Sequence, residues 1–112
     1  MKKILVATAL VAFATTASFA GDLVKEGEKI FNTKKIGNCF ACHAVNGKKI
    51  NGPGTLGPKL QGLSAWPEKA LYDKVYDPYT TNPISAMPAF GKNGVLDDKQ
   101  IKAVVAYLKT IK

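Results

Sequence analysis

The sequence contains no arginine, and this absence restricts the partners that its basic surface can have. All 16 basic residues are lysines, and they stand against eight acidic residues. Bidentate recognition of phosphate groups and of guanine favours arginine, so the composition argues against nucleic acid as a partner. A lysine surface suits loose electrostatic steering towards an acidic protein, and it equally suits a soluble chain with no dedicated partner.

Cysteine and histidine are also scarce. The chain has two cysteines, Cys39 and Cys42, and one histidine, His43. A structural zinc site takes four ligands, so this set is too small to build one. Alternating apolar runs typical of β-strands are lacking, as are internal repeats. The sequence therefore predicts an all-α protein with long loops.

Residues 1–20 have the pattern of a secretory signal. Lys2 and Lys3 precede an apolar run, Ile4–Ala14, and small residues occupy Ser18 and Ala20. The run is short for a membrane span, which needs about 20 residues, so an uncleaved anchor is the weaker alternative. We expect cleavage after Ala20 and export to the periplasm. The mature chain is then one domain, 21–112, with a net charge of +6 and no membrane insertion.

Three segments combine a capping residue or proline with apolar side chains at helical spacing. They run from Asp22 to about Lys34, from Pro67 to about Tyr76, and from Asp97 onwards. Gln100 follows Asp97 by three residues, which resembles a capping box. Glycine and proline are frequent between Asn46 and Gly62, which predicts an extended loop with tight turns.

The strongest chemical signal is CFACH, Cys39–His43. The pattern C-x-x-C-H is the attachment site of c-type haem. On one helical turn both cysteines can reach the haem vinyl groups while His43 points at the iron. A disulfide would leave His43 without a role, and a thioredoxin-like pair expects a βαβ setting. The motif predicts one haem c, attached through Cys39 and Cys42.

Met87 is the only methionine besides Met1, and it lies in the stretch NPISAMPAFGKNG. Pro83 and Pro88 flank it where neither a helix nor a strand can continue. Electron-carrying haem proteins commonly use a His/Met axial pair. We therefore expect His43 and Met87 to be the two iron ligands. The alternative is that Met87 is a packed hydrophobe and the sixth position is open or held by a lysine.

Together with the loop methionine and the closing helix, CFACH and GPKL (57–60) resemble a class I cytochrome c. That resemblance implies a small fold of about three to five helices with long loops around one covalent haem. It implies that the Pro58 carbonyl orients His43 through its outer ring nitrogen; a plain turn proline is the alternative. It also implies packing of the first helix against the last through Gly27, Phe31 and Tyr107.

A narrower resemblance rests on GNCFACH and on the run from Tyr76 to Leu108 that contains N-P-x-S-x-M-P-x-F-G-K-N-G. It is similar to the X subunit, the monohaem half, of the sulfur-oxidation cytochromes SoxAX. This implies a dihaem or monohaem SoxA-type partner that joins thiosulfate to a cysteine of a carrier protein, the L-cysteine S-thiosulfotransferase reaction. The present chain would pass the electrons to a small periplasmic cytochrome. The alternative is a free-standing class I cytochrome c of a respiratory or photosynthetic chain.

No side chain of this sequence is expected to act as a catalyst. Asp73 and Asp77 are the candidate carboxylate pair, and we interpret both as solvated residues on the polar side of a helix. Seven aromatic or apolar residues are expected to line the haem pocket: Phe40, Leu60, Trp66, Tyr76, Tyr79, Ile84 and Phe90.

Overall fold

The computed structural model describes residues 21–49 and 52–112. Its helices are residues 21–32, α2 (Glu68–Tyr76) and α3 (Asp98–Leu108), with 3-10 turns at Cys39–Ala41, Leu63–Ala65 and Pro78–Thr80. In these ranges the β-structure is a single bridge between Val45 and Leu60, which confirms the all-α class. None of the helices described is long and apolar enough to cross a membrane. The expected signal segment, residues 1–20, lies outside the described residues.

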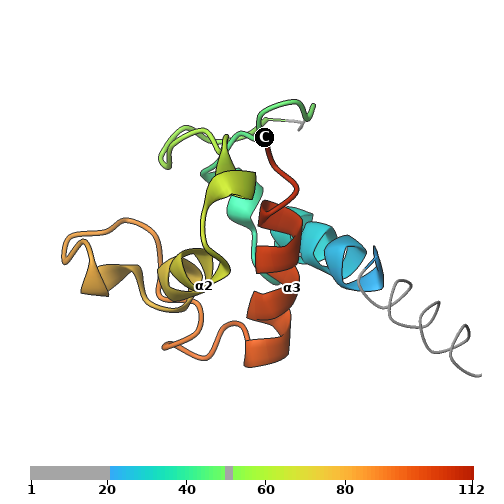
Figure 1. The fold of residues 1–112 in the computed structure, drawn as a ribbon. Coiled ribbons are helices and arrows are strands. Elements are labelled where there is room, and N and C mark those ends of the chain that lie inside the picture. The colour runs from blue at the N-terminus through green and yellow to red at the C-terminus, as the bar shows by residue number, and fades with distance from the viewer. Residues whose placement is uncertain (1–20, 50–51) are drawn as a thin grey trace, which may run out of the picture.

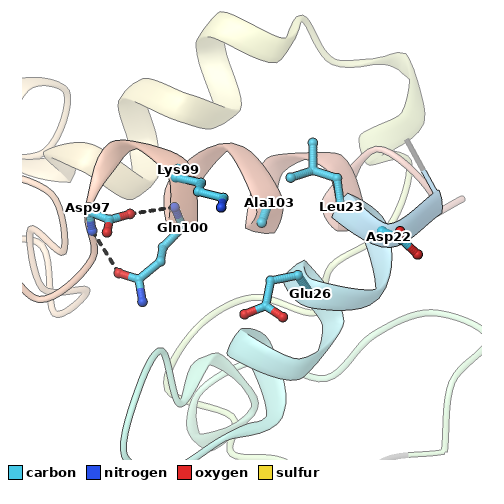
Figure 2. A pocket seen from close by; sticks show the side chains of 7 residues that line it. All are labelled: Asp22, Leu23, Glu26, Asp97, Lys99, Gln100 and Ala103. Carbon is cyan, nitrogen blue, oxygen red and sulfur yellow. Dashed lines mark hydrogen bonds between the residues drawn. The ribbon is translucent and has the colours of Figure 1, made fainter. Parts of the chain in front are cut away.

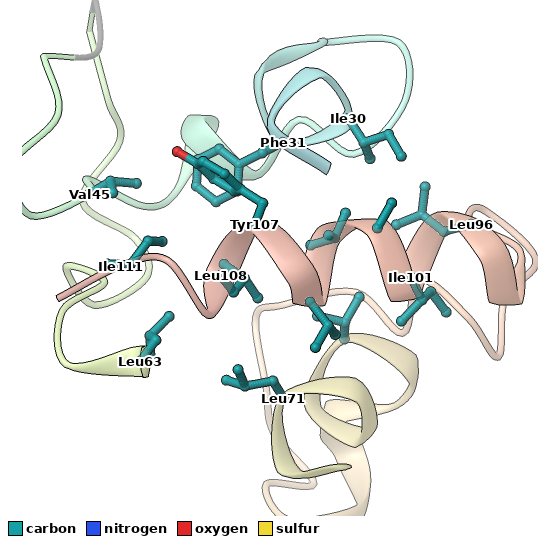
Figure 3. Packing of buried hydrophobic residues seen from close by; sticks show 14 residues of the cluster. Ile30, Phe31, Val45, Leu63, Leu71, Leu96, Ile101, Tyr107, Leu108 and Ile111 are labelled. Carbon is teal, nitrogen blue, oxygen red and sulfur yellow. The ribbon is translucent and has the colours of Figure 1, made fainter. Parts of the chain in front are cut away.

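The N-terminal helix (21–32) crosses α3 at close range (Figure 1). A Cβ atom on Gly27 would lie 1.9 Å from the Ala103 carbonyl oxygen and 2.9 Å from the Tyr107 Cβ. One helical turn further on, the Phe31 and Tyr107 rings meet edge to face, 5.4 Å apart (Figure 3). The packing implied for Gly27, Phe31 and Tyr107 is therefore present, and it lets the two backbones approach.

A capping box fixes the start of α3, as the sequence predicts. The Gln100 amide donates to Asp97 Oδ1 over 2.8 Å, and the Asp97 amide donates to Gln100 Oε1 over 2.9 Å (Figure 2). Along the helix, Ile101, Val104 and Leu108 are buried while the lysines Lys99 and Lys102 are exposed. The helix itself lies between the N-terminal helix on one side and α2 on the other, and its apolar stripe is part of the core (Figure 1).

The second helix, α2, packs against α3 through Leu71 and Val75, which are both buried. It ends at Tyr76 as predicted, but Pro67 is its N-cap and not its first helical residue. A hydrogen bond of 2.6 Å from the Tyr72 hydroxyl to Asp98 Oδ1 joins the two helices. It raises the pKa of Tyr72 to about 12 and lowers that of Asp98, because the bond favours the protonated phenol and the ionised carboxyl.

The first helix differs from its predicted bounds at both ends. Gly21 and Asp22 are already helical, so Asp22 is not the residue that caps the helix. The helix stops at residue 32 and not near Lys34. Here the Thr33 hydroxyl bonds to the Lys29 carbonyl, and both Ile36 and Asn38 donate backbone bonds to the Thr33 carbonyl, which turns the chain.

Candidate functional site

The CFACH motif forms one tight turn. Cys39–Ala41 is a 3-10 helix that follows Asn38, whose backbone is left-handed with φ 54°. Cys39 and Cys42 are both free thiols, so no disulfide occupies the motif. Burial raises the pKa of Cys39 to about 12, which keeps this thiol neutral. The turn therefore presents two thiols and an imidazole from a five-residue segment.

The imidazole of His43 is held in one orientation by the loop that follows. Its Nδ1 donates a hydrogen bond of 2.7 Å to the Pro58 carbonyl oxygen. A carbonyl only accepts, so Nδ1 carries the proton and Nε2 keeps a lone pair for a metal. Second partners of this kind commonly orient metal-binding histidines. The structure thus brings Pro58 to His43, as the resemblance implies.

Two glycines, Gly54 and Gly57, let the loop of residues 54–60 lie directly against the CFACH turn. A Cβ on Gly57 would come within 2.4 to 2.8 Å of three His43 ring atoms, and one on Gly54 would lie 1.6 Å from the Ala41 carbonyl oxygen. Three backbone bonds fasten the loop to the turn: Gly54 to Phe40, Gly57 to Cys42 and Leu60 to Ala44. Gly57 is the first residue of GPKL, but the motif alone assigns it no role. The glycine directly before Pro58 was the available signal.

Replacing Gly57 with alanine is expected to displace the His43 ring, because a β-carbon at this position overlaps the imidazole. Overpacking of this kind costs roughly 1–3 kcal/mol. We expect a lower yield of haem-loaded protein and a lower denaturation midpoint. Lys59→Ala, at an exposed position of the same loop, is the control. A Gly57→Ala protein that loads and melts like the control would contradict this account of the loop.

Residues 77–90, called the methionine loop from here on, are ordered by side chains of the loop itself. Ser85 Oγ accepts from the Met87 amide over 3.1 Å and donates to the Met87 carbonyl over 3.3 Å. Asn82 Oδ1 accepts from the Ile84 amide over 3.3 Å, which makes a local turn of the kind asparagine favours. Two residues of the N-P-x-S-x-M run thus hold the backbone that leads to Met87. The Met87 side chain is half-buried and packs against the core.

The expected pocket-lining residues fall into two groups. Phe40, Leu60 and Phe90 are partly buried against the core. The others are exposed by 40 to 91 %: Trp66, Tyr76, Tyr79 and Ile84. The pocket drawn in Figure 2 lies elsewhere, between the N-terminal helix and α3, where Asp22, Glu26 and Asp97 line it. None of the site residues predicted from the sequence lines that pocket.

The interpretation of Asp77 as a solvated residue was wrong, whereas Asp73 is exposed as expected. Asp73 lies on α2 and pairs with Lys69 over 2.6 Å. Asp77 is only 9 % exposed, and its Oδ1 accepts from the Tyr79 amide over 3.1 Å. The cause is Pro78, because a residue before proline disfavours helical backbone, and Asp77 is extended with φ −154° and ψ 91°. Its side chain therefore turns inward and caps the next 3-10 turn.

The donor set fits haem and does not fit a bare metal ion. Among the described residues, no group of three or more histidine, cysteine or acidic side chains is placed to hold a metal ion. The turn instead offers two thiols and an imidazole whose Nε2 has no hydrogen-bond partner among the described residues, and glycine at position 57 avoids a clash with that ring. Two cysteines for thioethers and one histidine for the iron are what haem c requires.

Comparison with known proteins gives the same result. The family model described as cytochrome C oxidase, cbb3-type, subunit III matches residues 22–108. The chain is 42 % identical over 82 residues to cytochrome c6 of Leptolyngbya boryana, which covers 73 % of this chain and 85 % of that protein. It is 36 % identical over 91 residues to an uncharacterized lipoprotein of Aquifex aeolicus (strain VF5). That alignment covers 77 % of this chain but only 44 % of the lipoprotein.

Among solved structures, a chain of the SoxXA crystal structure from P. pantotrophus superposes with a TM-score of 0.69 at 32 % identity. The match covers 77 % of this chain and 79 % of that chain. The present chain belongs to the class I c-type cytochromes, which carry covalently bound haem c and transfer electrons. Within that family its fold and sequence are similar to a SoxXA chain.

Proposed function

We propose that this chain is the monohaem electron-transfer subunit of a SoxAX-type thiosulfate-oxidising complex, exported to the periplasm after removal of residues 1–20. The observation that carries the proposal is the likeness to a SoxXA chain, which extends over 79 % of that chain at 32 % identity. The N-P-x-S-x-M-P run adds support because it resembles that of the X subunit, and its Asn82 and Ser85 order the backbone beside Met87.

In the proposed site, Cys39 and Cys42 would hold haem c through thioether bonds, and His43 and Met87 would ligate its iron. The Pro58 carbonyl holds Nδ1 of the imidazole, which leaves the other ring nitrogen, Nε2, available to the iron. Bound haem c supplies a one-electron couple, and a thioether ligand raises its reduction potential. Half-buried Phe40, Leu60 and Phe90 add apolar surface that excludes water. The chain itself only holds and tunes the electron carrier.

The sulfur chemistry is assigned to a SoxA-type partner, because this chain offers no group for it. His43 is the only histidine, both cysteines are committed to haem, and there is no arginine to grip an anion. Joining thiosulfate to a carrier-protein cysteine releases two electrons. This chain accepts them one at a time and passes each to a small periplasmic cytochrome.

Affinity purification of the tagged chain from its native host tests the assignment. We expect it to elute with a SoxA-type dihaem or monohaem cytochrome in equimolar amount, and the pair to be reduced by thiosulfate when the carrier protein is present. The pyridine spectrum of the isolated chain should be that of one c-type haem. Elution without any cytochrome companion would contradict the assignment.

A second function, that of a free-standing electron shuttle, is favoured by one observation. The 42 % identity to cytochrome c6 covers 85 % of that protein, so a free-standing carrier also resembles this chain over most of its length. A chain that elutes alone and is rapidly oxidised by host membranes would support this function. The two functions share every haem-binding residue, so only partnership separates them.

A further inference from the structure

The methionine loop begins at the end of α2, and its last residues return to that same helix end. The Tyr76 carbonyl, at the end of α2, accepts from the amides of both Gly91 (3.2 Å) and Lys92 (3.1 Å). A Cβ on Gly91 would lie 2.1 Å from a Tyr76 ring atom, so the returning strand of chain lies against that ring. Residues 77–90 therefore form a loop that is closed at its base, and Met87 lies within it.

Asp77 stands at this base, and its side chain is buried. It is the C-cap of α2, where the helix dipole favours cations, and also the N-cap of the 3-10 turn Pro78–Thr80. Its hydrogen bond from the Tyr79 amide does not need the charge, because asparagine caps as well as aspartate. The capping bond therefore uses one carboxylate oxygen, Oδ1, and leaves the other, Oδ2, for a charged partner.

The partner of the Asp77 carboxylate is a lysine at the other end of the loop. Lys92 Nζ lies 3.7 Å from Asp77 Oδ2, and the Asp77 side chain is 12 % exposed while that of Lys92 is 67 % exposed. The ion pair joins the first residue of the loop to the residue that follows Gly91. It is partly shielded from water on the carboxylate side, so it is screened less than a fully exposed pair.

We propose that Tyr76, Asp77, Gly91 and Lys92 form a neck clamp that keeps the methionine loop closed, with Asp77 as a positioning residue for the Met87 ligand. This rests on the proposed ligation of the iron by Met87. Closing a loop of this length costs conformational entropy. Contacts within the neck clamp offset this entropy cost. The Met87 sulfur is therefore already positioned before it bonds to the iron.

The second anchor of the loop lies outside the neck clamp. Lys74 Nζ on α2 donates to Thr81 Oγ1 over 2.8 Å and fastens the outgoing side of the loop. On the returning side, Ala89 is fully buried and its carbonyl accepts from the Asn93 amide. The apex between these points carries Met87.

The test uses the haem-loaded protein and four variants: Asp77→Asn, Lys92→Gln, their combination, and Asp73→Asn as the matched control. The control removes one carboxylate charge from an exposed pair with Lys69 on the same helix, away from the neck. The first readout is hydrogen exchange at the Gly91 and Lys92 amides. The second is the temperature at which the sulfur-to-iron absorption band is lost, compared with that of global unfolding by circular dichroism.

We expect Asp77→Asn and Lys92→Gln each to speed exchange at the two neck amides about fivefold, the scale of one partly shielded ion pair. The double variant should be no faster than either single variant, because both break the same pair. The band should be lost at a lower temperature while global unfolding moves less. Asp73→Asn should leave exchange at the neck and the band unchanged.

The failures of the two proposals are distinguishable. If the band is present in the wild type but Asp77→Asn and Lys92→Gln behave like Asp73→Asn in both readouts, the neck clamp is overturned and Met87 remains the ligand. If the wild type has no band, the ligation by Met87 fails, and the positioning role of Asp77 fails with it. Lys92→Gln alters an exposed side chain, so it provides the test even if Asp77→Asn does not fold.

Discussion

Replacing Met87 with alanine is expected to abolish the sulfur-to-iron absorption band and to lower the reduction potential. The thioether is a soft ligand that favours ferrous iron, and alanine leaves the sixth position to water or to a lysine. Axial ligands set haem potentials over a range of about 0.8 V, and we expect a fall on the order of 0.1 V or more. Redox titration of the purified protein, followed in the visible spectrum, measures both effects.

Ile84→Ala is the matched control for this experiment. Ile84 lies on the same loop, loses a side chain of similar size, and is 91 % exposed. It should keep the band and the potential of the wild type. An unchanged spectrum in Met87→Ala would show that the sulfur is not a ligand, and Met87 would then be the packed hydrophobe that the sequence also allows.

Replacing Gly27 with alanine is expected to destabilise the protein by roughly 2 to 4 kcal/mol, a large part of a typical domain's stability. The new methyl group would overlap the Ala103 carbonyl, and backbone cannot move aside as a flexible side chain can. Alanine also favours the helix by about 1 kcal/mol relative to glycine, which offsets only part of the loss. Urea unfolding of the haem-loaded protein measures the difference.

The control for Gly27→Ala is Gly21→Ala, which adds the same methyl group to the same helix. No described atom lies within 4 Å of that position, so this variant should be neutral or slightly more stable. If Gly27→Ala were as stable as Gly21→Ala, the crossing of the N-terminal helix and α3 would be able to widen at little cost. The Phe31–Tyr107 contact would then have to relax with it.

The fold could be predicted where its determinants are local. Asp97 and Gln100 define the start of α3 within four residues, and both hydrogen bonds of the capping box form. The end of the N-terminal helix could not be placed correctly, because nothing in the residues before Lys34 forbids helix. The helix stops early because the Thr33 carbonyl receives bonds from the following turn, an interaction visible only once that turn is folded.

The site, like the fold, could be predicted where its residues are close together in the sequence. CFACH is contiguous, so its chemistry can be predicted from the sequence. Contacts that join distant residues, such as that of Pro58 with His43, follow only from the family resemblance. The contact of Gly57 with His43, 14 positions earlier, follows from neither the local sequence nor the resemblance. Asp77 is an intermediate case. The Asp-Pro pair signals a turn and a cap, but the ion pair with Lys92 depends on a loop that returns to the end of α2.

The burial of Cys39 has a consequence for the order of events during assembly. In the folded chain its thiol has a pKa of about 12, so the reactive thiolate is nearly absent at neutral pH. A chain that folded before meeting haem would therefore have made one of its two attachment points slow to react. We therefore expect the thioether bonds to form more readily on an open chain than on one that has already folded.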